Sequence, residues 1–216
     1  MDNKKYDDLI SIYCLNKKKK IVQKKNVFFI AHNNWMLNQF KKTYPKFIKK
    51  IFLCKYYPIN NQIFKPRNKK KLRKKYNLPL DKKIIFFSAQ DLMDLRKGYD
   101  YFIDIVSKLK NHNDIFFVSI GKYKKNLTHI KNLSQIEFLP HNKISEVYSL
   151  SDIFICTSLI DNLPLTVLEA LSSGNLVISL KNGGSDEVLK NIGYTFKKNK
   201  KNKIINKLKK ISFLEI

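Results

Sequence analysis

Short apolar runs that alternate with helical stretches dominate the chain from residue 84 onward. The apolar runs are Ile84–Phe87, Ile115–Val118, Ile136–Leu139, Ile153–Cys156 and Leu176–Ser179. Strands that are apolar on both faces are typical of parallel sheets, because crossover helices cover both sides of such a sheet. The pattern therefore predicts an α/β fold, with a doubly wound, parallel, Rossmann-like sheet in this part of the chain.

The region before residue 84 is shorter and more irregular. It reads as a strand, a helix and a strand, over Val27–Ala31, Trp35–Lys42 and Ile51–Cys54. The sequence Phe64-Lys65-Pro66 then begins a charged helix that ends near Pro79. We interpret this charged stretch as the connector between two lobes.

The balance of charge is strongly basic, with 43 Lys and Arg against 17 Asp and Glu, a formal net charge of +26. Such a charge attracts anionic partners. However, the lysine runs Lys17–Lys20, Lys69–Lys75 and Lys197–Lys203 are expected in linkers or at helix ends, so we interpret them mainly as solvated surface. An anionic membrane surface remains a secondary partner. Nucleic acid is disfavoured because the aromatic residues fall mainly in strand cores.

Cysteine and histidine residues give no sign of a metal or cofactor. Cys14, Cys54 and Cys156 show no paired spacing and look like small core residues in a reducing compartment. The four His residues lack ligand spacing. We expect no metal, no cofactor, no spanning segment and a cytoplasmic location, with the inner face of the membrane as a peripheral site.

Two loops that follow predicted strands carry groups suited to phosphate. In a parallel sheet, ligands bind beyond the carboxyl ends of the strands, near helix N-termini. Arg96, Lys97 and Gly98 stand at one helix entrance, where two cations and a close backbone approach can hold an anion. Gly183 and Gly184 precede another helix. Either loop alone is equally consistent with a solvated turn.

A third loop and its helix are more informative. Pro164 suits the first turn of a helix and Gly174 suits its end. Glu169 is the charged residue of this otherwise apolar helix, and a buried charge needs a partner. A carboxylate can accept two hydrogen bonds from the vicinal hydroxyls of a ribose. The plain alternative makes Asp161 a helix cap and Glu169 a solvated side chain.

Together, these three segments resemble the group 1, retaining glycosyltransferases of the GT-B fold. The most specific element is a pair of carboxylates with seven residues between them, Asp161 and Glu169, followed by Ala170 and Gly174. The resemblance implies that residues 67–216 form the nucleotide-sugar-binding Rossmann-like domain. It implies that residues 1–66 are a remnant of the acceptor-side N-terminal lobe with its linker.

The resemblance also implies roles for individual residues. Glu169 would hold the ribose of the donor, and Asp161 would contact the transferred sugar. Lys97, with Arg96, would neutralise the diphosphate, so that Asp161 and Lys97 are the expected catalytic residues. The remaining contacts to the sugar or the phosphates are expected from Asn162, Leu163, Pro164, Leu165, Gly183 and Gly184.

Three departures from the family pattern stand out. Position 161 is usually Glu, and Asp is shorter by one methylene. Family members often carry a further Arg before Lys97, whereas the Asp91 region has none, so Arg96 is the expected substitute. The chain has room for only the last elements of the N-terminal domain, and the C-terminal crossover helix is expected to be cut short at Ile216.

Three classes of function therefore stand at this stage. The leading hypothesis is a glycosyltransferase that moves a sugar from a nucleotide diphosphate to an acceptor hydroxyl with retention. Its expected setting is the synthesis of surface polysaccharide or glycolipid, with a lipid-linked acceptor. The alternative is an inactive nucleotide-sugar-binding remnant, or a subunit that needs a separate N-terminal partner. The third is a basic protein that binds nucleic acid or membrane.

Overall fold

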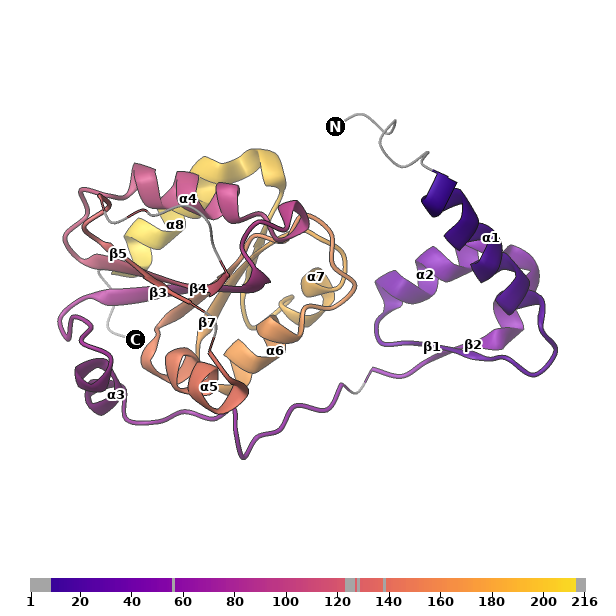
Figure 1. Cartoon of the computed structure of the whole chain (residues 1–216), viewed down its shortest axis with the longest axis horizontal. Helices are drawn as coiled ribbons and strands as arrows, with labels where there is room; N and C mark the ends of the chain where they lie inside the picture. Colours follow the sequence, from indigo (N-terminus) through magenta and orange to yellow (C-terminus); the bar gives the residue numbers. More distant parts are fainter. Residues whose placement is uncertain (1–8, 56, 123–126, 128, 138, 213–216) are drawn as a thin grey trace. The chain divides into compact units, whose positions relative to one another are not determined.

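The chain forms two compact units in a computed structural model that describes residues 9–55, 57–122, 127, 129–137 and 139–212 (Figure 1). The units are Met1–Tyr57 and Pro58–Ile216. The sequence interpretation placed the division later, after Pro66. The structure places it earlier because Phe64 is buried in the apolar core of the second unit.

The second unit is built on one six-stranded sheet whose order is β5-β4-β3-β6-β7-β8. Every neighbouring pair of strands is parallel. The strands are β3 (Lys83–Asp91), β4 (Ile115–Lys122), β5 (Leu133–Ile136), β6 (Ile153–Cys156), β7 (Leu176–Leu180) and β8 (Tyr194–Phe196). The central strands β3 and β6 are buried on both faces, which accounts for their continuous apolar runs.

Helices cover both faces of this sheet (Figure 1). The helices are α3 (Lys69–Lys75), α4 (Tyr99–Lys108), α5 (His141–Leu150), α6 (Leu165–Ser172), α7 (Ser185–Val188) and α8 (Lys201–Ser212), with short 3-10 turns at Leu95–Lys97 and Lys198–Lys200. Helices α4 and α8 build one core cluster with the sheet, and α5 and α6 build the other. The predicted doubly wound, Rossmann-like architecture is confirmed.

Several predicted elements lie elsewhere in the structure. The strand expected at 136–139 is β5, three residues earlier, because Leu133 pairs with Phe117 at the sheet edge. An edge strand bonds on one side only and tolerates polar residues, which hid it in the sequence. Strand β8 was missed. Phe138 lies outside the described residues, and so does Ile216, where the C-terminal crossover helix is expected to be cut short.

The lysine-rich segments were placed in part as predicted, since Lys197–Lys203 lie at a helix end, over a 3-10 turn and the start of α8. The charged connector helix begins at Lys69, where the Asn68 side chain accepts from the Lys71 amide, and not at Phe64. Lys17–Lys20 lie in the second half of the helix Leu9–Gln23, with Lys20 in its last turn, and not in a linker. Among the cysteines, Cys156 is buried, but Cys14 and Cys54 are exposed and are not core residues.

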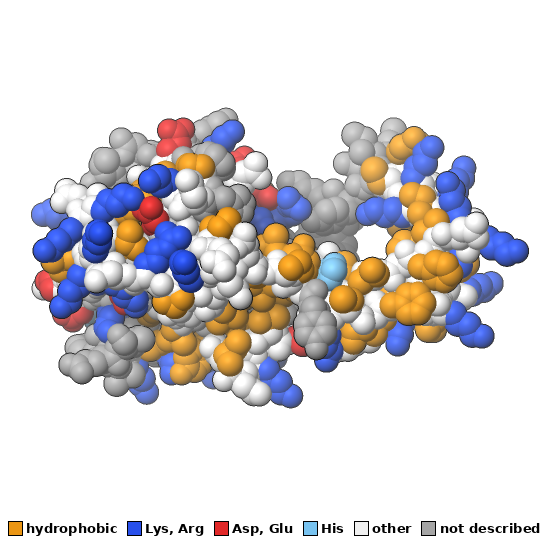
Figure 2. All heavy atoms as spheres, turned by 90° about the horizontal axis from the view of Figure 1, so that it is seen from below, with side chains coloured by type: hydrophobic (Ala, Val, Ile, Leu, Met, Phe, Trp, Pro, Cys, Tyr) orange, Lys and Arg blue, Asp and Glu red, His pale blue; other side chains and the backbone are white. Residues whose placement is uncertain are grey.

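The first unit contains a small two-stranded parallel sheet. Its elements are α1 (Leu9–Gln23), β1 (Phe29–Ala31), α2 (Asn34–Thr43), the 3-10 helix η2 (Pro45–Lys50) and β2 (Ile51–Leu53). The strand–helix–strand prediction is therefore confirmed. Figure 2 shows lysine and arginine side chains on both units, with exposed apolar side chains among them on the first. No helix in the described part of the chain is long and apolar enough to cross a membrane.

A buried ion pair fastens α3 to the sheet. Arg73 Nη2 donates to Asp152 Oδ2 at 2.6 Å, and both side chains are less than a tenth exposed. Lys69 Nζ donates to the other carboxylate oxygen at 2.8 Å, and the Ile84 amide donates to Oδ2 at 2.8 Å. The guanidinium also reaches the Leu150 carbonyl at 3.0 Å. Because its partners surround it, this buried carboxylate is compensated for its lost hydration.

Replacing Asp152 by Asn should destabilise the second unit by about 3 kcal/mol, because the Arg73 guanidinium is then buried without its counter-charge. The measurement is the free energy of unfolding in urea. The matched control is Asp104→Asn, which removes the more exposed pair with Lys201 and should cost less than about 1 kcal/mol. Equal losses in the two variants would contradict the structural role of Asp152.

The contribution of Asp152 should also depend on pH. Burial alone raises the pKa of this carboxyl group, but the bond from Lys69, the Ile84 amide and the Arg73 charge outweigh it and lower the pKa below its ordinary 3.8. The unfolded state then binds the proton more tightly, so the stabilisation is complete above about pH 3.8 and is lost as the pH falls through the lower folded value. Urea unfolding across that range should show the wild type approaching Asp152→Asn on acidification. A difference in unfolding free energy between the two proteins that stays constant with pH would contradict this dependence.

Candidate functional site

The order of strands locates the crevice of the sheet. From β3 the sheet grows through β4 to β5 on one side, and the chain then crosses to add β6, β7 and β8 on the other. At such a switch point, the loops that follow the two central strands diverge and leave a crevice beyond their carboxyl ends. Here these loops are residues 92–98 and 157–164, which lead into α4 and α6.

Hydrogen bonds to backbone carbonyls join these two loops directly. The Leu159 amide donates to the Arg96 carbonyl at 2.7 Å, and Thr157 Oγ1 donates to the Gly98 carbonyl at 2.8 Å. Gly98 has φ of 68°, and a Cβ added there would lie 2.2 Å from the Thr157 carbonyl oxygen. Only glycine fits this left-handed, close approach. Gly98 was expected to allow the close approach of an anion. The structure gives a different reason for a glycine there, because the close neighbour is the backbone of Thr157.

The two predicted catalytic residues meet at this junction. Lys97 Nζ donates to Asp161 Oδ2 at 3.0 Å across the two loops. The Lys97 side chain is 37% exposed and that of Asp161 is 18% exposed. An ion pair that is partly open to water is weak enough to be exchanged for another charged partner.

The glycine turn after β7 joins the same cluster. The Asp161 amide donates to the Asn182 carbonyl at 3.1 Å, and the Gly184 amide donates to the Asp161 carbonyl at 3.3 Å. Asp161 and Gly183 thus form a parallel bridge. Gly183 has φ of 127°, and Gly184 precedes α7. The structure brings together all three loops that the sequence singled out.

Arg96 is held within its own loop. Its guanidinium donates to Asp94 Oδ2 at 2.8 Å and to Oδ1 at 3.1 Å, and its side chain is largely exposed. The Arg96 amide also donates to Asp94 Oδ1. The bond from Arg96 is the main cause that lowers the pKa of the Asp94 carboxyl group. The sequence analysis did not foresee this acidic partner.

Glu169 is buried, as predicted, at only 8% exposure. The Tyr148 hydroxyl on α5 donates to Glu169 Oε2 at 3.0 Å, and the same hydroxyl lies 3.3 Å from Ser88 Oγ in the carboxyl-terminal half of β3. Burial, followed by the Glu169 charge, raises the pKa of Tyr148 well above its ordinary value. The sequence reasoning missed Tyr148. Its signal was a hydroxyl on the apolar face of a helix, next to Val147 and one turn after Ile144.

The helix that carries Glu169 lies where Pro164 and Gly174 predicted its two ends. Helix α6 begins after Pro164 and ends before Gly174, which has φ of 84°. Pro164 is buried, Leu163 is half-buried, and Asn162 and Leu165 are exposed. Contacts from these four residues to a ligand stay a prediction.

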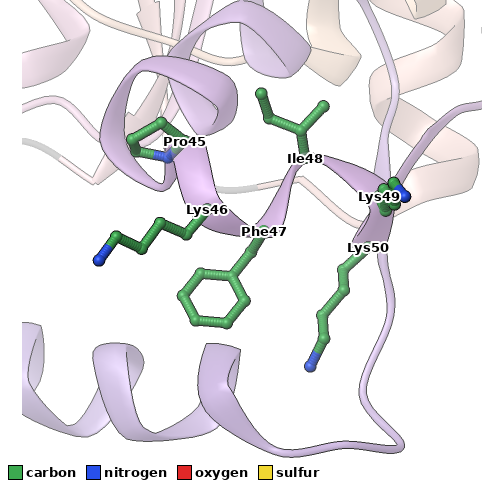
Figure 3. A pocket seen from close by; sticks show the side chains of 6 residues that line it. All are labelled: Pro45, Lys46, Phe47, Ile48, Lys49 and Lys50. Atoms are coloured by element: carbon green, nitrogen blue, oxygen red, sulfur yellow. The ribbon is translucent and has the colours of Figure 1, made fainter.

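Other parts of the described chain offer no stronger site. Within the described residues, no group of three or more His, Cys, Asp or Glu is arranged to hold a metal ion. A surface hollow in the first unit is lined by the residues Pro45–Lys50 of η2 (Figure 3). Its lysines and apolar side chains include no acid, and Lys50 Nζ donates to the Val22 carbonyl at 3.1 Å. This hollow lacks the mixed charges of the loop cluster.

Comparison with known proteins identifies the family. The model of "Glycosyl transferases group 1" matches residues 68–214, well over half of the chain. A glycogen synthase of Mycoplasma mobile is 31% identical over 146 residues, which cover 63% of this chain and 31% of that protein. The region that the family model matches, residues 68–214, includes all three loops of the candidate site.

Three solved structures, two of them described as glycosyltransferases, share the fold. A glycosyltransferase from Rickettsia africae ESF-5 has a TM-score of 0.75 at 22% identity, and the match covers 90% of this chain and 56% of that protein. WaaG, a glycosyltransferase involved in lipopolysaccharide biosynthesis, has a TM-score of 0.80 at 15% identity, with 96% and 60% covered. Anabaena Alr3699/HepE, in complex with UDP and glucose, has a TM-score of 0.76 at 14% identity, with 94% and 59% covered.

The chain spans about a third of the length of the glycogen synthase and less than two thirds of these three solved chains. Its sheet corresponds to the Rossmann-like C-terminal half of the GT-B fold. The family match, the fold and the meeting of the three loops agree, and this chain belongs to the group 1 glycosyltransferases.

Proposed function

We propose that the chain carries the donor site of a retaining glycosyltransferase, which moves a sugar from a nucleotide diphosphate to an acceptor hydroxyl. The observation that carries the proposal is the placement of Glu169. This buried carboxylate lies in the second turn of α6. Helix α6 directly follows the loop that carries Asp161, the residue with which Lys97 of the other loop pairs. A nucleotide sugar needs such a neighbouring set of groups for its ribose, its diphosphate and its sugar.

Glu169 is assigned to the ribose. A carboxylate in a site with little water gains more from charge-assisted hydrogen bonds than an exposed one, and two vicinal hydroxyls can donate to it together. Its place on a helix fixes where those hydroxyls must lie. The complex of Alr3699/HepE with UDP and glucose makes UDP-glucose the first donor to test.

Lys97 is assigned to the diphosphate and Asp161 to the transferred sugar. The arriving diphosphate would take the Lys97 ammonium from Asp161, and the released carboxylate could then accept hydroxyl hydrogen bonds from the sugar. Arg96 can add a second cation, because its exposed pair with Asp94 costs little to exchange. Gly183, Gly184 and the backbone of residues 162–165 are assigned to close contacts with the sugar and phosphates.

The proposed reaction proceeds with retention of configuration at the anomeric carbon. The bond from that carbon to the diphosphate oxygen breaks, and the acceptor oxygen bonds to the carbon on the same face. The acceptor proton passes to the departing phosphate oxygen, which lies beside the incoming hydroxyl. Lys97 stabilises the charge that grows on the leaving diphosphate. The proposal needs no metal or other cofactor.

Surface polysaccharide or glycolipid is the proposed setting, in line with the printed role of WaaG in lipopolysaccharide biosynthesis. The second candidate is a module that binds a nucleotide sugar without transfer, or that transfers only with a separate N-terminal partner. Transfer to an added acceptor, with the anomer of the product read by NMR, distinguishes the two.

Replacing Glu169 by Gln should weaken the binding of UDP-glucose, or of the best of a panel of UDP-, GDP- and ADP-sugars, by about 10- to 100-fold. The reason is that the amide keeps a single, uncharged acceptor oxygen, so one hydroxyl loses its acceptor and the other loses a charge-assisted hydrogen bond. Isothermal titration at two salt concentrations provides the measurement. The control is Glu146→Gln, which removes a carboxylate that accepts from Tyr76 outside the site. Equal affinity of wild type and Glu169→Gln would contradict the assignment, and binding that merely tracks ionic strength would favour a non-specific basic protein.

The first unit is proposed to attract the chain to an anionic membrane that carries the acceptor. Phe28 and Phe52 are 62% and 56% exposed, and their ring centroids lie 6.0 Å apart. Basic side chains share the surface of this unit with exposed apolar ones (Figure 2). The full chain should therefore sediment with vesicles of phosphatidylglycerol and phosphatidylcholine, more than with phosphatidylcholine alone. Phe28→Ser combined with Phe52→Ser should reduce this several-fold, whereas Ile192→Ser on the second unit should not. Equal binding to neutral vesicles, or none to anionic ones, would contradict the proposal.

A further inference from the structure

The hydroxyl of Tyr148 is placed where the apolar core does not need it. The Tyr148 ring is fully buried, and it packs against the rings of Phe64, Phe86 and Phe154 at centroid distances of 5.8, 4.9 and 5.4 Å. A phenylalanine would make the same ring contacts. Burying a hydroxyl costs free energy unless it finds a partner, and here a partner is the carboxylate of Glu169.

This hydroxyl is a permanent donor to Glu169. The raised pKa of Tyr148 keeps its proton in place over the range in which proteins are stable. The hydrogen bond at 3.0 Å fixes Oε2, and the contact with Ser88 Oγ at 3.3 Å ties the hydroxyl to the carboxyl-terminal half of β3. The orientation of the Glu169 side chain on α6 is therefore linked to α5 and to the central strand of the sheet.

We propose that Tyr148 is a positioning residue for nucleotide binding, whose hydroxyl holds the Glu169 carboxylate in the orientation that receives the donor ribose. This inference rests on the proposed role of Glu169. Both hydroxyls of a diol can donate to a carboxylate only when the carboxylate plane has one orientation. If the carboxylate could rotate freely, fixing that orientation on binding would cost free energy and weaken the affinity. Pre-ordering by a buried donor removes that loss.

The test compares a ribonucleotide with its analogue that lacks the diol. Tyr148→Phe keeps the ring and removes the hydroxyl. It should weaken the binding of UDP, or of whichever of UDP, GDP and ADP binds best, by about tenfold. It should leave the affinity for the matching 2′,3′-dideoxy nucleotide unchanged, because that ligand cannot use the carboxylate. Titration calorimetry of the full chain measures both.

The matched control is Tyr76→Phe, which also removes a phenol that donates to a glutamate, Glu146, at 2.8 Å. It should change neither affinity. Ser88→Ala offers a second, gentler perturbation of the same hydroxyl and should act in the same direction, on the ribonucleotide alone. Thermal unfolding of each variant monitors the fold.

Two results would overturn the positioning role. Unchanged affinity of Tyr148→Phe for the ribonucleotide is one, and an equal loss for the dideoxy nucleotide is the other, since that indicates a general structural effect. Glu169→Gln separates the two levels of the proposal. If it binds the ribonucleotide as tightly as the wild type, the ribose role itself is wrong; if it alone weakens binding, only the Tyr148 role is wrong. In the double variant, Tyr148→Phe should add little to Glu169→Gln.

Discussion

The reversal of strand order between β3 and β6 is the constraint on which the candidate site depends. Because the sheet grows outward in both directions from this pair, the loops that carry Lys97 and Asp161 leave neighbouring strands at the same edge. The bond from the Leu159 amide to the Arg96 carbonyl and the close approach at Gly98 then lock these loops together. The Lys97–Asp161 pair is a consequence of this backbone junction.

Two buried acids on either side of β6 illustrate the difference between structure and function. Asp152 precedes the strand, at its amino end, where Arg73 and Lys69 supply cations and Ile84 supplies an amide. Glu169 follows the strand, on the side where ligands bind in such sheets, and it receives the neutral hydroxyl of Tyr148. The first arrangement fastens α3 to the sheet. The second keeps a negative charge near a cluster that can receive a ligand.

Local signals predicted much of the fold and the three loops. Continuous apolar runs predicted β3, β4, β6 and β7, and Pro164 and Gly174 predicted the ends of α6, because each depends on neighbours in the sequence. Pairings between distant residues carried no such signal. Neither the partner of Arg73 nor that of Glu169 could be predicted, because each lies on another element, and the polar edge strand β5 shows little apolar pattern.

The segment before α3 packs against the helices of the candidate site, although the predicted boundary assigned it to the other lobe. Phe64 packs its ring against Tyr148, and Ser172 at the end of α6 donates to the Phe64 carbonyl at 2.7 Å. Pro66 leaves just enough room for a glycine at position 174, where a Cβ would lie 3.3 Å from the proline ring. The helices that carry Tyr148 and Glu169 are thus braced by residues that precede the family match, which begins at residue 68. The second unit begins at Pro58. Removing Phe64 from it would leave one side of the Tyr148 ring without its packing partner.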